Sequence, residues 1–162
     1  MAELTNLEEK LAEVVGLAMA AQGATEKVRK LEEADEHAGV LEKMNGEAAE
    51  TERRGVDLID SMEGRKTAIL EKARETKSKA NDMLRTYIDE ESDALDGFEF
   101  LTMAEAGEVG HWKVLSRMAE KAGQAQMIEL TQWALPIQER HFSDVQNTSL
   151  ELATKEDPNE TS

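Results

Sequence analysis

The sequence contains no cysteine, which excludes disulfide bonds and thiolate chemistry and is compatible with a reducing cytoplasm. Aromatic residues make up only 4% of the chain, there are 2 prolines, and no stretch alternates polar and apolar residues as a half-buried strand does. These shortages argue against a β-sheet protein, because strands are enriched in aromatic and β-branched residues.

Positive charge is also scarce, since 19 Lys and Arg stand against 35 Asp and Glu, a formal net charge of −16. A nucleic-acid partner needs a basic surface to meet its phosphate backbone, and an anionic membrane attracts basic segments. The charge therefore argues against both partners, and it favours cations near the surface and keeps the protein soluble.

Long hydrophobic runs are missing as well, and no stretch is apolar for long enough to cross a bilayer. The first residues, MAELTNLEEK, contain no basic region followed by an apolar run, so no signal peptide is expected. From these features we expect a soluble protein located in the cytoplasm.

What the sequence does contain is typical of long helices: charged residues make up 33%, together with many Ala, Leu, Glu and Lys. We predict an all-α protein with one helical domain over 1–155 and a disordered acidic tail over 156–162. Thr5 or Asn6 is the expected cap of the first helix, and Gly123 ends the fourth. The five expected helical segments are 4–31, 34–62, 65–91, 93–122 and 124–153.

The first, second, fourth and fifth segments are long enough to form a four-helix bundle. We interpret 65–91 as an added helix in one long crossover between two hairpins. Coiled-coil arrays are an alternative, because the apolar residues follow three-four spacing. The short turn at Gly123 favours an antiparallel hairpin within one chain. The stripe predicted for 65–91 consists of Ile69, Ala73, Thr76, Ala80, Met83 and Tyr87.

The fourth segment carries two carboxylates on its apolar stripe. Glu105 and Glu108 stand where apolar residues are expected, and His111 follows Glu108 by one helical turn. Such a Glu-x-x-His pair on a helix can reach a single metal ion. The apolar members of the stripe are Ala94, Phe98, Leu101, Trp112, Leu115, Ala119 and Ala122.

The fifth segment carries a matching pair, because Gln138 and His141 fall on its inward stripe. This stripe consists of Met127, Thr131, Ala134, Gln138, His141, Val145, Thr148 and Leu152. Glu108 and Gln138 lie equally far before and after Gly123, so an antiparallel hairpin brings the two polar layers to the same height. Pro136 predicts a kink just before Gln138, which suggests room for a ligand. The alternative is that Pro136 marks the start of the last helix.

On these residues the chain resembles the ferritin-like superfamily of carboxylate-bridged diiron proteins, and more closely its small bacterial, stress-associated members. The resemblance is clearest over 93–153, in EFLTMAEAGEVGHWKVLSRMAEKAG and QWALPIQERHF. It implies that Glu108 is the single glutamate of one bundle helix, with His111 as an unusual extra. Gln138 and His141 lie where the family has Glu-x-x-His, and the amide that replaces the carboxylate is a weaker ligand.

The first two helices match the family less well. The resemblance implies a first-helix carboxylate, which Glu26 could supply, or Gln22 in its place. In the second helix it implies Glu-x-x-His, but the sequence offers Glu47 and Glu50, with His37 further away. The full diiron set cannot be filled, so a single metal ion, an altered site and a lost site all stay open.

Each candidate also has a structural interpretation. Glu105 could pair with an arginine at the helix edge, Glu108 and His111 could be a buried hydrogen-bonded pair, and His141 could belong to a polar layer that fixes helix register. His37 is expected to be exposed near a helix start.

Three functions follow from these alternatives. The first is a ferritin-like protein that binds iron or another divalent metal in its core, in oxidative or metal stress. The second is a metal-free, homodimeric interaction protein whose polar layer is structural. A lipid-surface binder is the weakest, because of the excess of acid. The sequence indicates no nucleotide or organic cofactor and does not decide whether the protein is an enzyme.

Overall fold

The computed structural model describes residues 3–161 and is helical, with no strand in that range. The predicted all-α class is therefore confirmed. A short 3-10 helix, Asp35–His37, precedes α2. The five long helices are α1 (Asn6–Arg29), α2 (Ala38–Asp60), α3 (Lys66–Tyr87), α4 (Ala94–Ala122) and α5 (Ala125–Lys155).

The ends of the helices follow local sequence signals. Thr5 caps α1 and Asp93 caps α4. In both cases the side chain of the cap residue accepts a hydrogen bond from the backbone N–H of the third residue of the helix, and the side chain of that third residue accepts one from the backbone N–H of the cap residue. Gly123 ends α4 with a φ of 65°, a left-handed conformation that glycine adopts without strain. Pro136 lies inside α5, so the alternative that it starts the last helix is wrong.

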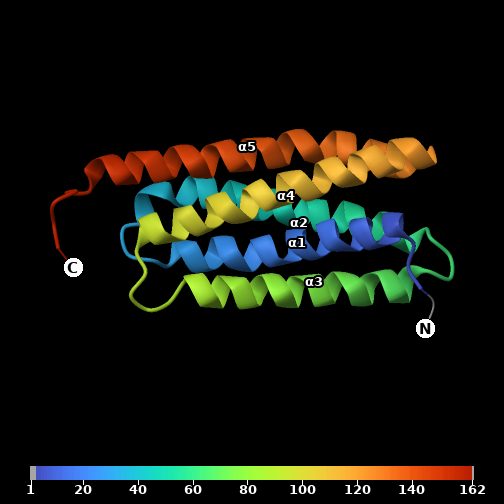
Figure 1. Cartoon of the computed structure of the whole chain (residues 1–162), viewed down its shortest axis with the longest axis horizontal. Coiled ribbons are helices and arrows are strands. Elements are labelled where there is room, and N and C mark those ends of the chain that lie inside the picture. The colour runs from blue at the N-terminus through green and yellow to red at the C-terminus, as the bar shows by residue number, and fades with distance from the viewer. Residues whose placement is uncertain (1–2, 162) are drawn as a thin grey trace.

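The helices lie side by side along one long axis (Figure 1). α1 contacts α2, α3 and α4, whereas α5 contacts α4 and α2. α2 and α4 run in the same direction, so the chain must return along the length of the molecule between them, and α3 makes this return (Figure 1). Within residues 3–161, none of the helices has the length and apolar character that a membrane crossing requires.

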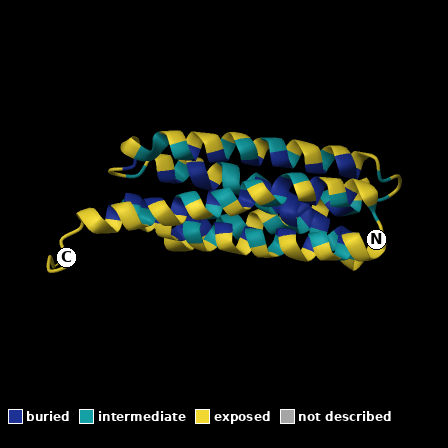
Figure 2. Cartoon of the chain, turned by 90° about the horizontal axis from the view of Figure 1, so that it is seen from above, coloured by how far each residue is buried: buried dark blue, intermediate teal, exposed yellow. Residues whose placement is uncertain are grey.

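The predicted inward stripes of α4 and α5 are confirmed from Ala94 to Ala119 and from Met127 to Leu152, whereas Ala122, the last predicted member on α4, is exposed. Figure 2 shows the alternation of buried and exposed positions along each helix. α1 is buried on more than one face, because α3 covers the side that carries Gly16. A Cβ at Gly16 would lie 2.3 Å from the carbonyl oxygen of Ala73, so only glycine allows this approach of the two backbones.

The stripe predicted for α3 is wrong at its C-terminal end. Met83 and Tyr87 are 50% and 57% exposed, whereas Leu84 is buried in their place. α3 packs mainly on α1, so it buries a narrower face than a helix that is enclosed by neighbours.

The core is divided into two apolar clusters at opposite ends of the long axis. The first apolar cluster includes Leu11, Val15, Ile59, Trp112, Leu115 and Met127. The second apolar cluster includes Val28, Leu41, Met44, Phe98, Leu101 and Val145. On α4 and α5, the buried residues between these clusters are polar.

Candidate functional site

A polar core layer, which we define as Glu105, Glu108, Gln138 and His141, separates the two apolar clusters. α4 supplies the two glutamates and α5 supplies the glutamine and the histidine. Their exposed fractions are 2%, 5%, 2% and 2%. The hairpin closed at Gly123 thus brings the polar residues of both helices together in the interior, as their spacing from the turn predicts.

Gln138 connects the two carboxyl groups. With its amide oriented so that donors meet acceptors, its nitrogen donates to Oε2 of Glu105 at 3.0 Å and to Oε2 of Glu108 at 3.1 Å. Both N–H bonds of the amide are then used. Gln138 therefore presents donors, not its carbonyl oxygen, to the two carboxyl groups.

His141 lies between carboxyl groups from two helices. Its Nε2 is 3.1 Å from Oε1 of Glu47 on α2, and its Nδ1 is 3.9 Å from Oε2 of Glu105 on α4. Arg140 also pairs with Glu47. Burial acts to raise the pKa of Glu47, but the hydrogen bonds from Arg140 and His141 outweigh it, so this pKa is lowered.

The two glutamates of the polar core layer behave in the opposite way. Burial raises the pKa of Glu105, and burial together with the neighbouring Glu105 raises the pKa of Glu108 well above its ordinary value. Burial and the closeness of the two carboxyl groups therefore favour the protonated form of Glu108.

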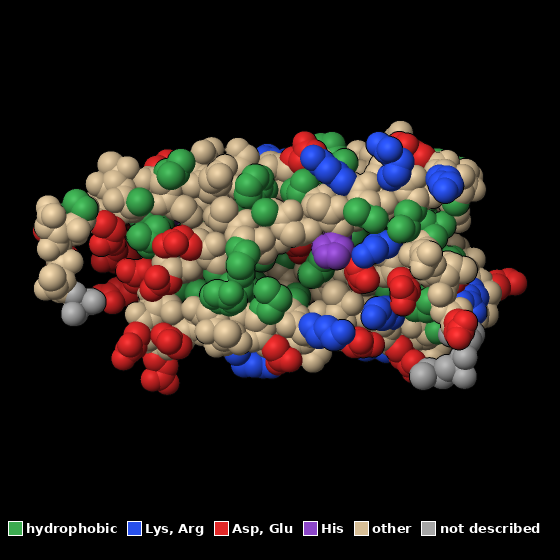
Figure 3. Space-filling model, in the orientation of Figure 1, with side chains coloured by type: hydrophobic (Ala, Val, Ile, Leu, Met, Phe, Trp, Pro, Cys, Tyr) green, Lys and Arg blue, Asp and Glu red, His purple; other side chains and the backbone are tan. Residues whose placement is uncertain are grey.

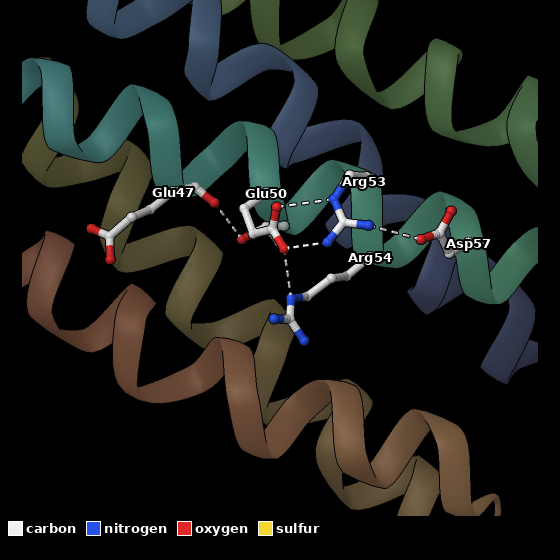
Figure 4. A network of polar contacts seen from close by, with 6 residues as sticks. Glu47, Glu50, Arg53, Arg54 and Asp57 are labelled. Atoms are coloured by element: carbon white, nitrogen blue, oxygen red, sulfur yellow. Dashed lines mark hydrogen bonds and ion pairs between the residues drawn. The ribbon is translucent and has the colours of Figure 1, made fainter.

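The other sequence candidates lie outside this layer. His111 has a side chain that is 41% exposed and its Nδ1 is 3.3 Å from Oε2 of Glu13 on α1, so it is not the hydrogen-bonded partner of Glu108. Glu50 is held by Arg53 and Arg54 on the surface of α2, and Figure 4 shows these arginines turned toward it. Of the two glutamates three residues apart on α2, only Glu47 reaches the interior.

α1 contributes no described carboxylate to the polar core layer. Glu26 is exposed, and Gln22 donates to Oε1 of Glu52 at 2.7 Å instead. The prediction that His37 is exposed is wrong, because its ring is half-buried and packs edge-on against Phe98 with a centroid distance of 5.6 Å. The suggested pairing of Glu105 with an arginine is also wrong, since its partners are in the layer.

A cavity of about 220 Å³ opens beside the polar core layer, between α1, α3 and α4. On the α1 side it is bounded by Ala20, Ala21 and Ala24, and Glu105 and Glu108 are among its polar lining residues. Figure 3 shows a hollow on this face with hydrophobic side chains around it. Sequence reasoning missed the cavity, although a run of small residues on α1 was its visible signal.

The polar core layer does not fit a metal ion as it is arranged. Both nitrogens of His141 face carboxyl oxygens, and Gln138 turns its N–H groups inward. The guanidinium of Arg140 forms an ion pair with Glu47. Within residues 3–161, no three side chains of His, Asp or Glu gather in a geometry that could hold one ion. Metal ligands would have to be deprotonated and to point their lone pairs at a common centre.

No protein-family model matches the chain, and no curated protein matches its sequence. The geometry of the polar core layer and of the cavity beside it is therefore what indicates a function.

Proposed function

We propose that the protein is a ferritin-like four-helix bundle of α1, α2, α4 and α5, with α3 as the added helix of the crossover. Two observations support this architecture. α2 and α4 run in the same direction, which demands a connection as long as the bundle, and the short turn at Gly123 makes α4 and α5 a hairpin.

We further propose that the bundle works by binding another protein chain, without a metal, and that its polar core layer has a structural role. The observation that supports this role is the mutual pairing of the layer. Gln138 donates to both glutamates, His141 lies 3.1 Å from a carboxyl oxygen of Glu47, and burial raises the pKa of Glu108. Buried polar groups of this kind are satisfied in one register of the helices and orphaned in others, so they specify the alignment of α4 and α5.

The proposed interaction partner is a second copy of the chain. Large apolar side chains are exposed on α3, α4 and α5, namely Met83, Tyr87, Met103, Val114 and Leu150. A homodimer would remove part of this surface from water. We place the protein in the cytoplasm, because its lack of cysteine fits a reducing compartment.

Divalent metal binding is a second candidate, which one observation favours. A carboxyl oxygen of Glu47 on α2 and one of Glu105 on α4 lie 3.1 Å and 3.9 Å from the ring nitrogens of His141 on α5. To become ligands, Glu105 and Glu108 would have to be deprotonated against their raised pKa values, Gln138 would have to turn its oxygen inward, and the guanidinium of Arg140 would have to leave Glu47.

A measurement of metal content separates the two candidates. The protein is produced in medium with iron, manganese and zinc, and metal per chain is measured for the wild type and for His141→Ala. We expect no stoichiometric metal in either protein and no change in melting temperature when a chelator is added. One metal per chain that His141→Ala loses would overturn the structural role of the layer. Light scattering on the same sample tests the homodimer.

A further inference from the structure

The cavity between α1, α3 and α4 has the composition of a small-molecule site. Most of its lining is apolar, including Leu17, Leu84, Phe100 and Leu101, and Met83 and Met103 are half-exposed beside it. Ligand sites in proteins are concave and mostly apolar, with a few polar groups that fix the orientation of the ligand. At about 220 Å³ the cavity is larger than an engineered cavity of roughly 150 Å³ that binds benzene.

The polar groups of this cavity are carboxyl groups at a buried end. Glu105 and Glu108 line it, and both are at most 5% exposed. No Lys or Arg is among the described residues that line it, and the one imidazole, His111, faces Glu13. The chain as a whole carries a formal charge of −16. Both the local and the overall charge therefore favour a cationic ligand and disfavour an anion.

We propose that this cavity binds a small amphipathic amine, with its apolar body against α1 and α3 and its ammonium group against the carboxyl of Glu108. An ammonium group has three N–H donors and needs charged or polar acceptors when it leaves water. When the amine binds, Glu108 gives its proton to water and becomes the carboxylate that accepts these bonds. Charge-assisted hydrogen bonds of this kind are about twice as strong as neutral ones.

The chemistry distinguishes an amine from a neutral ligand of the same shape. A neutral molecule would gain the apolar contacts but would meet the uncharged acid form of Glu108, which burial and the neighbouring Glu105 favour. It would therefore lack the charge-assisted contact. The geometry thus favours a cation at the buried end and an aromatic or alkyl body in the apolar part.

The test compares 2-phenylethylamine with 2-phenylethanol, which differ only in the group that would meet Glu108. Binding to the full chain is measured by calorimetry and by nuclear magnetic resonance shifts. We expect the amine to bind about tenfold more tightly than the alcohol or better, and Glu108→Gln to remove most of this preference. Equal binding of both probes, binding of neither at millimolar concentration, or an unchanged preference in Glu108→Gln overturns the proposal.

A pair of glycines on α4 provides the control for location. Gly107 lines the cavity and Gly110 does not, both are exposed, and a Cβ at either position would meet nothing within 4 Å. Gly107→Leu should weaken amine binding by about tenfold, whereas Gly110→Leu should leave it unchanged, with a similar gain in helix propensity for both. Undiminished binding in Gly107→Leu would place the amine elsewhere and overturn the proposal.

This inference goes beyond the structural role proposed for the polar core layer, and the two can fail separately. Stoichiometric metal would overturn the structural role, whatever the result with the amine. Failure of the amine to bind would leave the metal measurement unchanged.

Discussion

The two pairs of helices meet the middle of the molecule in different ways. α4 and α5 bring four buried polar side chains to it, whereas α1 brings alanines and α2 brings Glu47. The first pair is joined by a tight turn, so its polar residues face each other at a fixed height. In the second pair α1 offers small residues, and the space that they leave becomes the cavity between α1, α3 and α4.

A core layer can be polar and still be closed when one hairpin supplies nearly all of its donors and acceptors. The pairing then depends on a single helix–helix register. The opposite helix contributes little polar surface that would have to be matched. The comparison predicts that substitutions in the α4–α5 layer act through broken polar pairing, whereas substitutions on α1 act through packing.

The largest effect is expected for His141→Ala. It leaves Glu47 and Glu105 without their shared partner and creates a buried hole, so it should lower the free energy of unfolding by about 3–5 kcal/mol. His111→Ala is the matched control, because its imidazole is 41% exposed and meets a carboxylate at the surface. It should change stability by less than about 0.5 kcal/mol. Urea unfolding of both variants checks this, and equal losses would contradict the division between the two histidines.

A smaller effect, on packing alone, is expected for Gly16→Ala on α1. Its Cβ would lie 2.3 Å from the carbonyl oxygen of Ala73, so α3 must shift away, and we expect a loss of about 1–3 kcal/mol. Gly23→Ala on the same helix meets nothing within 4 Å and should gain about 0.5–1 kcal/mol from helix propensity. Thermal unfolding of the two variants measures the difference. A gain in stability in both variants would mean that the backbones of α1 and α3 do not approach each other closely at Gly16 and Ala73.

The sequence was sufficient for the elements that depend on local signals. The inward stripes of α4 and α5 up to Ala119 and Leu152, the cap at Thr5 (one of the two residues expected there) and the end of α4 at Gly123 all follow from helical spacing and capping chemistry. The common height of Glu108 and Gln138 followed as well, because it requires only a short turn.

The sequence was insufficient where a side chain's position depends on a neighbouring helix. Glu47 and Glu50 are three residues apart on α2, and only tertiary contacts with Arg140 and His141 decide which one turns inward. The same holds for the second buried face of α1, since its small residues become core only when α3 covers them. A stripe pattern reports one buried face of a helix and is silent about a second one.

The last prediction concerns the pH dependence of stability, to which Glu108 and Glu8 should contribute with opposite signs. Burial holds the pKa of Glu108 well above 4.5, so at higher pH the folded chain keeps a proton that the unfolded chain releases. This group therefore makes stability fall as pH rises above about 4.5. Glu8, on α1, has the opposite sign: hydrogen bonds from Arg65 lower its pKa to about 2, so its contribution is present above about pH 4.5 and is lost as pH falls toward 2.

Glu108→Gln should consequently stabilise the protein at pH 8 and should have little effect below pH 4. Glu8→Gln should be destabilising at pH 8, and its effect should shrink as the pH falls toward 2. The exposed Glu139→Gln is the control on α5 and should leave the pH dependence unchanged. Urea unfolding of the three variants between pH 2 and pH 8 gives the slopes. If Glu108→Gln destabilised the protein more at pH 8 than at pH 4, Glu108 would be a carboxylate in the folded chain. The polar core layer would then hold a buried negative charge that demands a cation, and this result would favour a metal over the closed, protonated layer.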